Sequence, residues 1–335
     1  MSIGSMRVAI NGFGRIGRLV LQAGINNENI QWVAVNDLTD TETLAHLFKW
    51  DSVFGRFPGT VEATKDALVI NGKEIQVLSQ TDPAKLPWKQ LKVDVVVEST
   101  GFFRDKKEAS KHVKAGAKKV VVSAPMDDAD FTVVLGVNDE GYNPKKHHVV
   151  SNASCTTNAL APLVKVLDDH FKVEKGFMIT GHSYTSDQKL VDGPHKDLRR
   201  ARSAAVSIIP TSTGAAKAVG KVMPHLNGKL DGVAWRVPTP DGSIVNLTCT
   251  VKKKATAEAI NKAFEKAAEH ELHGYLEYSD EPLVSRDIVH NPHSSIFDSL
   301  STNVIGNLVS VTGWYDNEWG YSHRMIELLC RLFPE

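Results

Sequence analysis

The stretch Arg7-Val-Ala-Ile-Asn-Gly-Phe-Gly-Arg-Ile-Gly-Arg18 decides the fold of the first half of this chain. Residues 7–10 predict a short buried strand, and the apolar spacing of residues 16–20 predicts a helix. Between them, three glycines have the spacing of a tight turn that lets a pyrophosphate approach the backbone and brings the helix against the strand. The competing interpretation is a surface turn that happens to contain glycine. Strand, turn and helix in the required order favour a dinucleotide-binding unit.

An acidic residue follows this turn at the distance expected for recognition of an adenosine ribose. A second predicted strand, residues 32–35, ends at Asn36–Asp37, and Asp37 lies 20 positions after Gly17. Further buried-type strands at 93–97, 120–122 and 131–135 alternate with a helix-like segment at 104–117. This alternation predicts a parallel, doubly wound sheet whose ligand lies at the carboxyl ends of the strands.

The second half of the chain has a different pattern. Longer strands are predicted at 176–180, 208–209, 231–237, 243–251 and 305–312, with helices at 214–223, 256–269 and 320–333. The sequence therefore predicts an α/β Rossmann nucleotide-binding domain over residues 1–150, followed by an α+β catalytic domain with a mainly antiparallel sheet over residues 151–317.

The two halves meet at Ser151-Asn-Ala-Ser-Cys-Thr-Thr-Asn158, which precedes a helical pattern of apolar residues. Ser154 or a neighbour can cap that helix, because small hydroxyl and amide side chains accept hydrogen bonds from first-turn amides. Cys155 would then lie where free amides and the helix dipole favour an anion. A nearby imidazolium would lower the pKa of the thiol further. Cys155 is therefore a candidate nucleophile, and the alternative is a buried structural cysteine.

This stretch resembles the active-site signature of the phosphorylating glyceraldehyde-3-phosphate dehydrogenases. Four other motifs resemble the same family in the same order, and together they cover essentially the whole chain: Asn11–Arg18, Val97–Gly101, Pro210–Val219 and Trp314–Tyr321. The resemblance implies a glycolytic enzyme that oxidises glyceraldehyde 3-phosphate with NAD and inorganic phosphate to 1,3-bisphosphoglycerate, through a thioester on Cys155. It also implies that the terminal helix, about residues 318–335, completes the nucleotide-binding domain.

The resemblance further assigns roles to single residues. His182 is the implied base, which would form an ion pair with the thiolate and later take the proton of the thiohemiacetal hydroxyl. The implied contacts with NAD come from Gly12, Phe13, Gly14, Arg15, Ile16, Gly17, Asp37, Ser123 and Asn317, the last of which fixes the nicotinamide amide. The implied phosphate and substrate contacts come from Ser154, Thr156, Thr185, Arg200, Thr213, Gly214 and Arg236. Arg202 stays open as an alternative to Arg200.

Composition narrows the choice of partners and location. Lys plus Arg equals Asp plus Glu at 39 each, which argues against a charge-driven nucleic-acid or membrane partner. No apolar run approaches the roughly 20 residues that cross a membrane, and no secretory signal is present. Three cysteines, an odd number, favour a reducing, cytoplasmic location over a disulfide framework. No metal site is expected. Residues 1–5 are either native or an addition before a natural start at Met6.

The loop from Ser183 to Ser207 is too long for a free connector. We expect a partner subunit to order it in a homotetramer, as in the resembling family. Asp37 carries a negative charge where NADP places its 2′-phosphate, so NAD is the expected cofactor. Two other functions stay open: the related erythrose-4-phosphate dehydrogenase, which shares the cysteine signature, and a surface or nucleic-acid-binding protein that has kept the fold.

Overall fold

The computed structural model describes residues 5–333, which form two compact units. Unit 1 comprises residues 1–133, 140–153 and 322–335, and unit 2 comprises residues 134–139 and 154–321. The two units divide at residues 153–154, and residues 134–139 also belong to unit 2. The question of an addition at residues 1–5 falls almost entirely outside the described residues.

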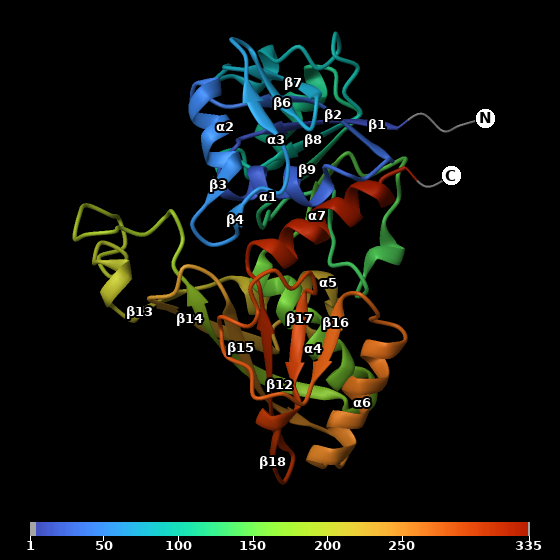
Figure 1. Cartoon of the computed structure of the whole chain (residues 1–335). Coiled ribbons are helices and arrows are strands. Elements are labelled where there is room, and N and C mark those ends of the chain that lie inside the picture. The colour runs from blue at the N-terminus through green and yellow to red at the C-terminus, as the bar shows by residue number, and fades with distance from the viewer. Residues whose placement is uncertain (1–4, 334–335) are drawn as a thin grey trace. The chain divides into compact units, whose positions relative to one another are not determined.

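Unit 1 is built on one sheet in which nine strands can be described, in the order β10-β11-β9-β8-β1-β2-β7-β6-β5 (Figure 1). The strands are β1 (Met6–Asn11), β2 (Ile30–Asn36), β5 (Val61–Ala63), β6 (Ala67–Ile70), β7 (Lys73–Leu78), β8 (Val95–Glu98), β9 (Lys119–Val122), β10 (Phe131–Thr132) and β11 (Val149–Ser151). Neighbours from β10 to β7 pair in parallel, and β6 and β5 add an antiparallel edge. The predicted parallel sheet is confirmed, although the strand predicted at 131–135 is only two residues long.

The helices of unit 1 follow the strands as an α/β order requires. They are α1 (Arg15–Gly24), α2 (Thr41–Lys49) and α3 (Lys106–Lys114), with a small hairpin of β3 (Trp50–Asp51) and β4 (Gly55–Arg56) after α2. The turn between β6 and β7 is Asn71-Gly72, and both residues have positive φ, as two-residue hairpins of the favoured twist need.

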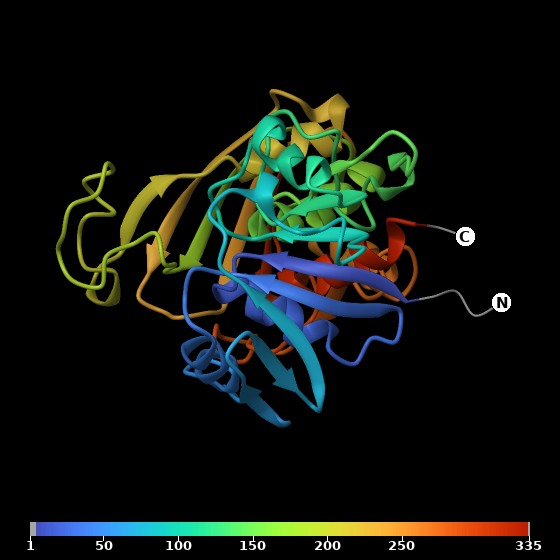
Figure 2. The same cartoon turned by 90° about the horizontal axis from the view of Figure 1, so that it is seen from above.

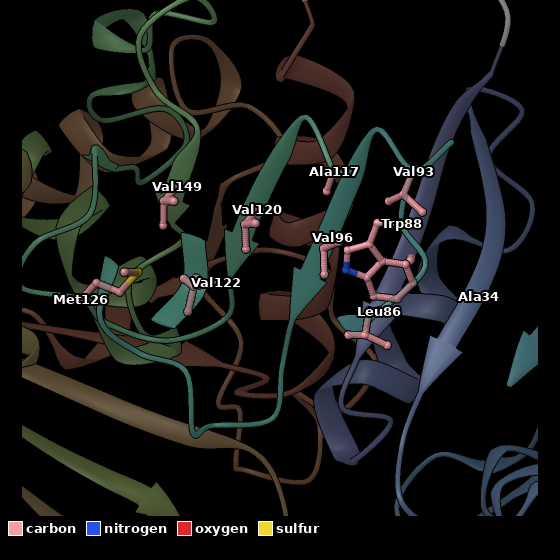
Figure 3. Packing of buried hydrophobic residues seen from close by; sticks show 12 residues of the cluster. Ala34, Leu86, Trp88, Val93, Val96, Ala117, Val120, Val122, Met126 and Val149 are labelled. Atoms are coloured by element: carbon pink, nitrogen blue, oxygen red, sulfur yellow. The ribbon is translucent and has the colours of Figure 1, made fainter. Parts of the chain in front are cut away.

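Valines of β8, β9 and β11 contribute to a buried hydrophobic cluster of unit 1 (Figure 3). Val96 on β8 lies opposite Val120 on β9, and both side chains are fully buried. Trp88 packs in the same cluster and donates its indole N–H to Nδ1 of His112 on α3, at 2.9 Å. A Val-rich strand buried on both faces is typical of a parallel sheet, because helices cover it on either side.

Unit 2 contains a second sheet, in which eight strands can be described, ordered β13-β14-β12-β15-β19-β17-β16 with β18 paired to β19. The strands are β12 (Val173–Ser183), β13 (Ile209–Ser212), β14 (Leu230–Val237), β15 (Ser243–Val251), β16 (Leu276–Ser279), β17 (Ser295–Asp298), β18 (Asn303–Ile305) and β19 (Leu308–Tyr315). All pairs are antiparallel except β12–β14 and β16–β17. The predicted mainly antiparallel sheet is therefore confirmed.

One strand prediction is wrong. The segment 305–312 was expected to be continuous, but the chain turns at Gly306, which has a φ of +63°. Asn303–Ile305 then folds back on β19 as a separate edge strand. Strands β16 and β17 were not predicted, because their four residues each are too few to show a period.

The helices of unit 2 are α4 (Cys155–Phe171), α5 (Ala215–Val222), α6 (Ala257–Glu269) and the start of α7 (Trp319–Arg331), whose residues from Ser322 belong to unit 1. Between β12 and β13 the loop of residues 184–208 extends away from the sheet, as Figure 2 shows in yellow-green. None of the helices described is long and apolar enough to cross a membrane. Over residues 5–333, no group of three metal-ligating side chains is suited to a metal ion.

Candidate active site

Cys155 is the first residue of helix α4. Ser154 caps this helix, since its Oγ accepts a hydrogen bond from the Thr157 amide at 3.0 Å, and the predicted cap is confirmed. The cap leaves the remaining first-turn amides and the positive end of the helix dipole beside the thiol. Cys155 as a whole keeps some exposure, unlike the buried Cys249. A structural cysteine would need no such position.

His182 reaches the thiol from the end of strand β12. Its Nε2 lies 3.4 Å from the Cys155 Sγ, and its Nδ1 lies 2.7 Å from the Ser183 carbonyl oxygen. The parallel register of β12 and β14 sets His182 beside Arg236. Arg236 Nη1 lies 2.7 Å from His182 Nδ1 and donates to the Ser183 carbonyl at 2.9 Å. Three predicted residues from three elements therefore converge.

The charges in this cluster differ from the predicted ion pair. Burial, and after it the neighbouring Arg236 guanidinium, lowers the pKa of His182 to about 3. Burial also raises the pKa of the Cys155 thiol, against the opposing effect of Arg236. These directions run against the expected imidazolium, because burial and a neighbouring cation both disfavour a positive charge on a histidine. Arg236 is the cation that favours the thiolate.

Tyr315 is a member of this site that the sequence analysis did not single out. Its hydroxyl lies 2.9 Å from the Thr156 Oγ1 on α4 and 2.9 Å from the Thr180 Oγ1 on β12. Its ring also meets the His182 ring edge-on, with centroids 6.0 Å apart. Tyr315 therefore joins the helix that carries the nucleophile to the strand that carries the histidine. It lies inside the Trp314–Tyr321 motif, from which only Asn317 was assigned a role.

In unit 1, the glycine turn has the shape that a dinucleotide needs. Gly12 has a φ of +92°, and a Cβ there would meet the Thr100 backbone at 2.6 Å, so no other residue fits. A Cβ on Gly17 would come within 2.2 Å of the Gly12 carbonyl oxygen, which shows how closely α1 packs on β1. The space around Gly14 is open, and no side chain caps the helix that begins after it. Free amides facing open space suit a pyrophosphate.

Asp37 lies at the end of β2 beside this turn. Its Oδ2 accepts the Phe13 amide at 2.8 Å and its Oδ1 accepts the Thr39 amide at 3.0 Å. Two backbone donors therefore hold the carboxylate in place. Arg15, the first residue of α1, was also expected to contact NAD. Its guanidinium forms an ion pair with Asp51. Ser123 follows β9, and its amide donates to the Glu98 carbonyl at 2.9 Å.

Comparison with known proteins matches both units. A family model described as the NAD-binding domain of glyceraldehyde 3-phosphate dehydrogenase matches residues 6–106, and one described as its C-terminal domain matches residues 154–317. The glyceraldehyde-3-phosphate dehydrogenase of Geobacillus stearothermophilus is 57% identical over 325 residues, covering 97% of each chain. That of Mycobacterium avium is 57% identical over 333 residues, covering 97% of this chain and 98% of its own. The chain belongs to the glyceraldehyde-3-phosphate dehydrogenase family.

Membership in the glyceraldehyde-3-phosphate dehydrogenase family makes this an NAD-dependent oxidoreductase, as its sequence predicted. NAD supplies the hydride acceptor when it is bound. The glycine turn, the exposed end of α1 and Asp37 fit this cofactor through the open approach at Gly14 and the fixed carboxylate. Phe13 and Ile16, also expected at this site, lie within the same turn and helix start.

The expected phosphate residues lie in the same unit as Cys155. Arg200 bonds to Asp187 at 2.5 Å and to the Thr211 Oγ1 at 2.9 Å, and its charge lowers the pKa of His182. Arg202 instead pairs with Asp192 at 2.8 Å and is more exposed. Of the two arginines left open, Arg200 is therefore the one whose field reaches the histidine.

The remaining expected contacts surround helix α5 and the turn after β12. Gly214 is the residue before α5 and offers this helix no side-chain cap, and the Thr213 Oγ1 accepts the Ala215 amide at 3.2 Å. The Thr185 amide N–H donates a hydrogen bond to the Gln188 Oε1 at 3.3 Å. Arg236 carries a buried Nε that has no hydrogen-bond partner within residues 5–333. A buried guanidinium nitrogen left unpaired is costly, so this position suits an incoming anion.

Asn317 follows β19 and is almost fully buried. Its Oδ1 accepts a hydrogen bond from the Ser243 hydroxyl at 2.5 Å. Ser243 and Ser183 were not predicted as site residues, since a serine inside a strand pattern has no distinguishing signal in one sequence.

Proposed function

We propose that this chain oxidises D-glyceraldehyde 3-phosphate with NAD and inorganic phosphate to 1,3-bisphosphoglycerate, as a step of glycolysis. The observation that carries the proposal is the 3.4 Å approach of His182 Nε2 to the Cys155 thiol at a capped helix N-terminus. The Cys155 thiolate adds to the aldehyde carbon and forms a thiohemiacetal. His182 takes the hydroxyl proton of this adduct as the carbon loses a hydride, and a thioester remains.

Inorganic phosphate then attacks the thioester carbonyl. The carbon–sulfur bond breaks, the acyl group leaves as an acyl phosphate, and Cys155 is restored as a thiolate. Arg236 and Arg200 are the cations we assign to the two phosphates, with Thr185, Thr213 and Gly214 as further donors. An anion on Arg236 would offset the charge beside His182. The pKa of His182 would then rise. His182 would therefore be a stronger base when phosphate is bound than when the site is empty.

We assign residues 1–150 with the C-terminal helix, about 318–335, to cofactor binding, and residues 151–317 to catalysis. Asn317 is assigned to the nicotinamide amide, and Ser154 and Thr156 flank the nucleophile. We further propose a cytoplasmic homotetramer. Free thiols at Cys155, Cys249 and Cys330 support a reducing location. Exposed apolar side chains in the loop of residues 184–208 support its burial by a partner subunit.

The test is formation of NADH by the purified protein, with and without inorganic phosphate. Glyceraldehyde 3-phosphate should be turned over only slowly when phosphate is left out, because the thioester then accumulates. Erythrose 4-phosphate is the comparison substrate, and a higher kcat/KM for it would overturn the assignment. Cys155→Ser is the control, and it should form no acyl-enzyme.

A further inference from the structure

Ser243, the first residue of strand β15, has a fully buried hydroxyl between two other parts of unit 2. Its Oγ accepts the Ser183 amide N–H at 3.1 Å and donates to the Asn317 Oδ1 at 2.5 Å. A hydroxyl has one proton to give. Because the Ser183 amide occupies a lone pair of the oxygen, that proton remains for the amide oxygen of Asn317.

This bond selects one of two orientations of the Asn317 side chain. A carboxamide has an acceptor and a donor end that differ little in shape, so packing alone discriminates poorly between them. With Oδ1 held by Ser243, the NH₂ group is the end left to donate. A ligand bound by Asn317 would therefore be recognised through an acceptor atom.

The same hydroxyl also connects Asn317 to the histidine. Ser183 turns its carbonyl oxygen to His182 Nδ1 at 2.7 Å and its amide N–H to Ser243. Its own hydroxyl lies 3.0 Å from the Thr239 Oγ1. One backbone residue thus fixes the histidine on one side and, through Ser243, the asparagine on the other.

We propose that Ser243 is a positioning residue, which holds the Asn317 amide with its NH₂ group free to donate to the carboxamide oxygen of NAD. This inference rests on the proposed role of Asn317 toward the nicotinamide. Ser243 itself touches no reacting atom, so its effect is confined to the nicotinamide half of the cofactor.

The test compares the dissociation constants of NAD and of ADP-ribose, which lacks the nicotinamide, by isothermal titration calorimetry. Ser243→Ala should raise the constant for NAD about threefold to tenfold, as expected for one lost hydrogen bond. It should leave the constant for ADP-ribose within about twofold. Asn317→Ala should also raise the dissociation constant of NAD and leave that of ADP-ribose unchanged. The double variant should bind NAD no more weakly than Asn317→Ala alone, because the two side chains act as one unit.

The outcomes distinguish the positioning role of Ser243 from the proposed role of Asn317 toward the nicotinamide. If Asn317→Ala weakens NAD selectively and Ser243→Ala does not, the positioning role is wrong. If neither variant changes the ratio, the proposed role of Asn317 fails first. Ser295→Ala is the matched control, since its buried hydroxyl in β17 has no hydrogen-bond partner within the described chain. Should Ser243→Ala fail to fold, Ser243→Cys keeps a weak donor and should show a smaller selective loss.

Discussion

Arg236 Nη1 lies 2.7 Å from His182 Nδ1, so a permanent cation already occupies the side of the imidazole away from the thiol. A positive charge on the imidazole would lie beside the positive guanidinium and is therefore unfavourable. Arg236 is instead the cation that stabilises the Cys155 thiolate. We expect Arg236→Leu to shift the pH profile of Cys155 alkylation by iodoacetamide to higher pH. His182→Asn should shift it by less than about one unit, since each unit changes the thiolate fraction tenfold.

The same His182→Asn variant should lower the rate of hydride transfer by about 10²- to 10⁴-fold, the usual range for loss of a general base. Alkylation and single-turnover kinetics on one preparation thus separate the two roles of the histidine. A large alkaline shift of the alkylation profile in His182→Asn would show instead that the resting enzyme contains the imidazolium–thiolate pair.

The second prediction concerns the choice between NAD and NADP. Backbone amides of Phe13 and Thr39 hold the Asp37 carboxylate in place beside the glycine turn. A 2′-phosphate near it meets like charge, so kcat/KM should favour NAD clearly. Asp37→Ser should bring the NADP to NAD ratio of kcat/KM up by at least tenfold. Equal use of both cofactors by the unaltered protein would contradict this explanation.

The third prediction separates two functions of Arg236. Its guanidinium contacts His182 and the Ser183 carbonyl, so Arg236→Leu should slow oxidation of any aldehyde. A charge-assisted contact with phosphate adds roughly 1.5–3 kcal/mol, or about 10- to 150-fold. The kcat/KM for glyceraldehyde 3-phosphate should therefore fall by that additional factor relative to unphosphorylated glyceraldehyde. If kcat/KM falls equally for the two substrates, Arg236 acts through its contact with His182 and does not bind the substrate phosphate.

The fourth prediction is a pH dependence of stability. Asp241 is buried, and burial, together with the negative charge of the neighbouring Asp316, raises its pKa to about 9. The folded protein holds this proton up to about pH 9, whereas the unfolded chain releases it near the ordinary value of 3.8. Unfolding therefore releases a proton between these values, and stability falls as pH rises through that window.

Asp241→Asn removes this dependence, because a carboxamide does not titrate and carries no charge beside Asp316. The free energy of unfolding in urea should be measured at pH 5.5, 7 and 8.5. The advantage of Asp241→Asn should grow by up to about 1.4 kcal/mol for each pH unit. Parallel curves for the two proteins would mean that the carboxyl group is not protonated in the folded state.

The fifth prediction concerns assembly. In the loop of residues 184–208, Leu198 and Val206 are each 80% exposed, which is unfavourable for apolar side chains unless another surface covers them. We expect the mass of a tetramer by light scattering at micromolar concentration. Leu198→Glu with Val206→Glu should shift the distribution to smaller species, and Leu300→Glu, 61% exposed but outside this loop, is the comparison. A monomeric mass for the unaltered protein would exclude the tetramer.

Local features were predictable from the sequence, and long-range contacts were not. The glycine turn, the Ser154 cap and the α/β order depend on residues close in the chain, where spacing carries the information. The contact between His182 and Arg236 depends on the parallel register of β12 and β14, which no local pattern reveals. The lowered pKa of His182 depends on long-range structure in the same way, because its main cause is burial and its second is Arg236, 54 residues away in sequence.

Helix α7 enters unit 1 only after the whole of unit 2 has been made. Within unit 1, Ile326 and Trp32 both lie against Gly24, and Asn27 reaches the Cys330 thiol at 3.5 Å. Ribosomes add about 5–20 residues per second, so the first unit waits on the order of 10–30 s for this helix. Throughout that interval a nascent chain carries an uncovered apolar patch on its first unit, which is where chaperones would act on it.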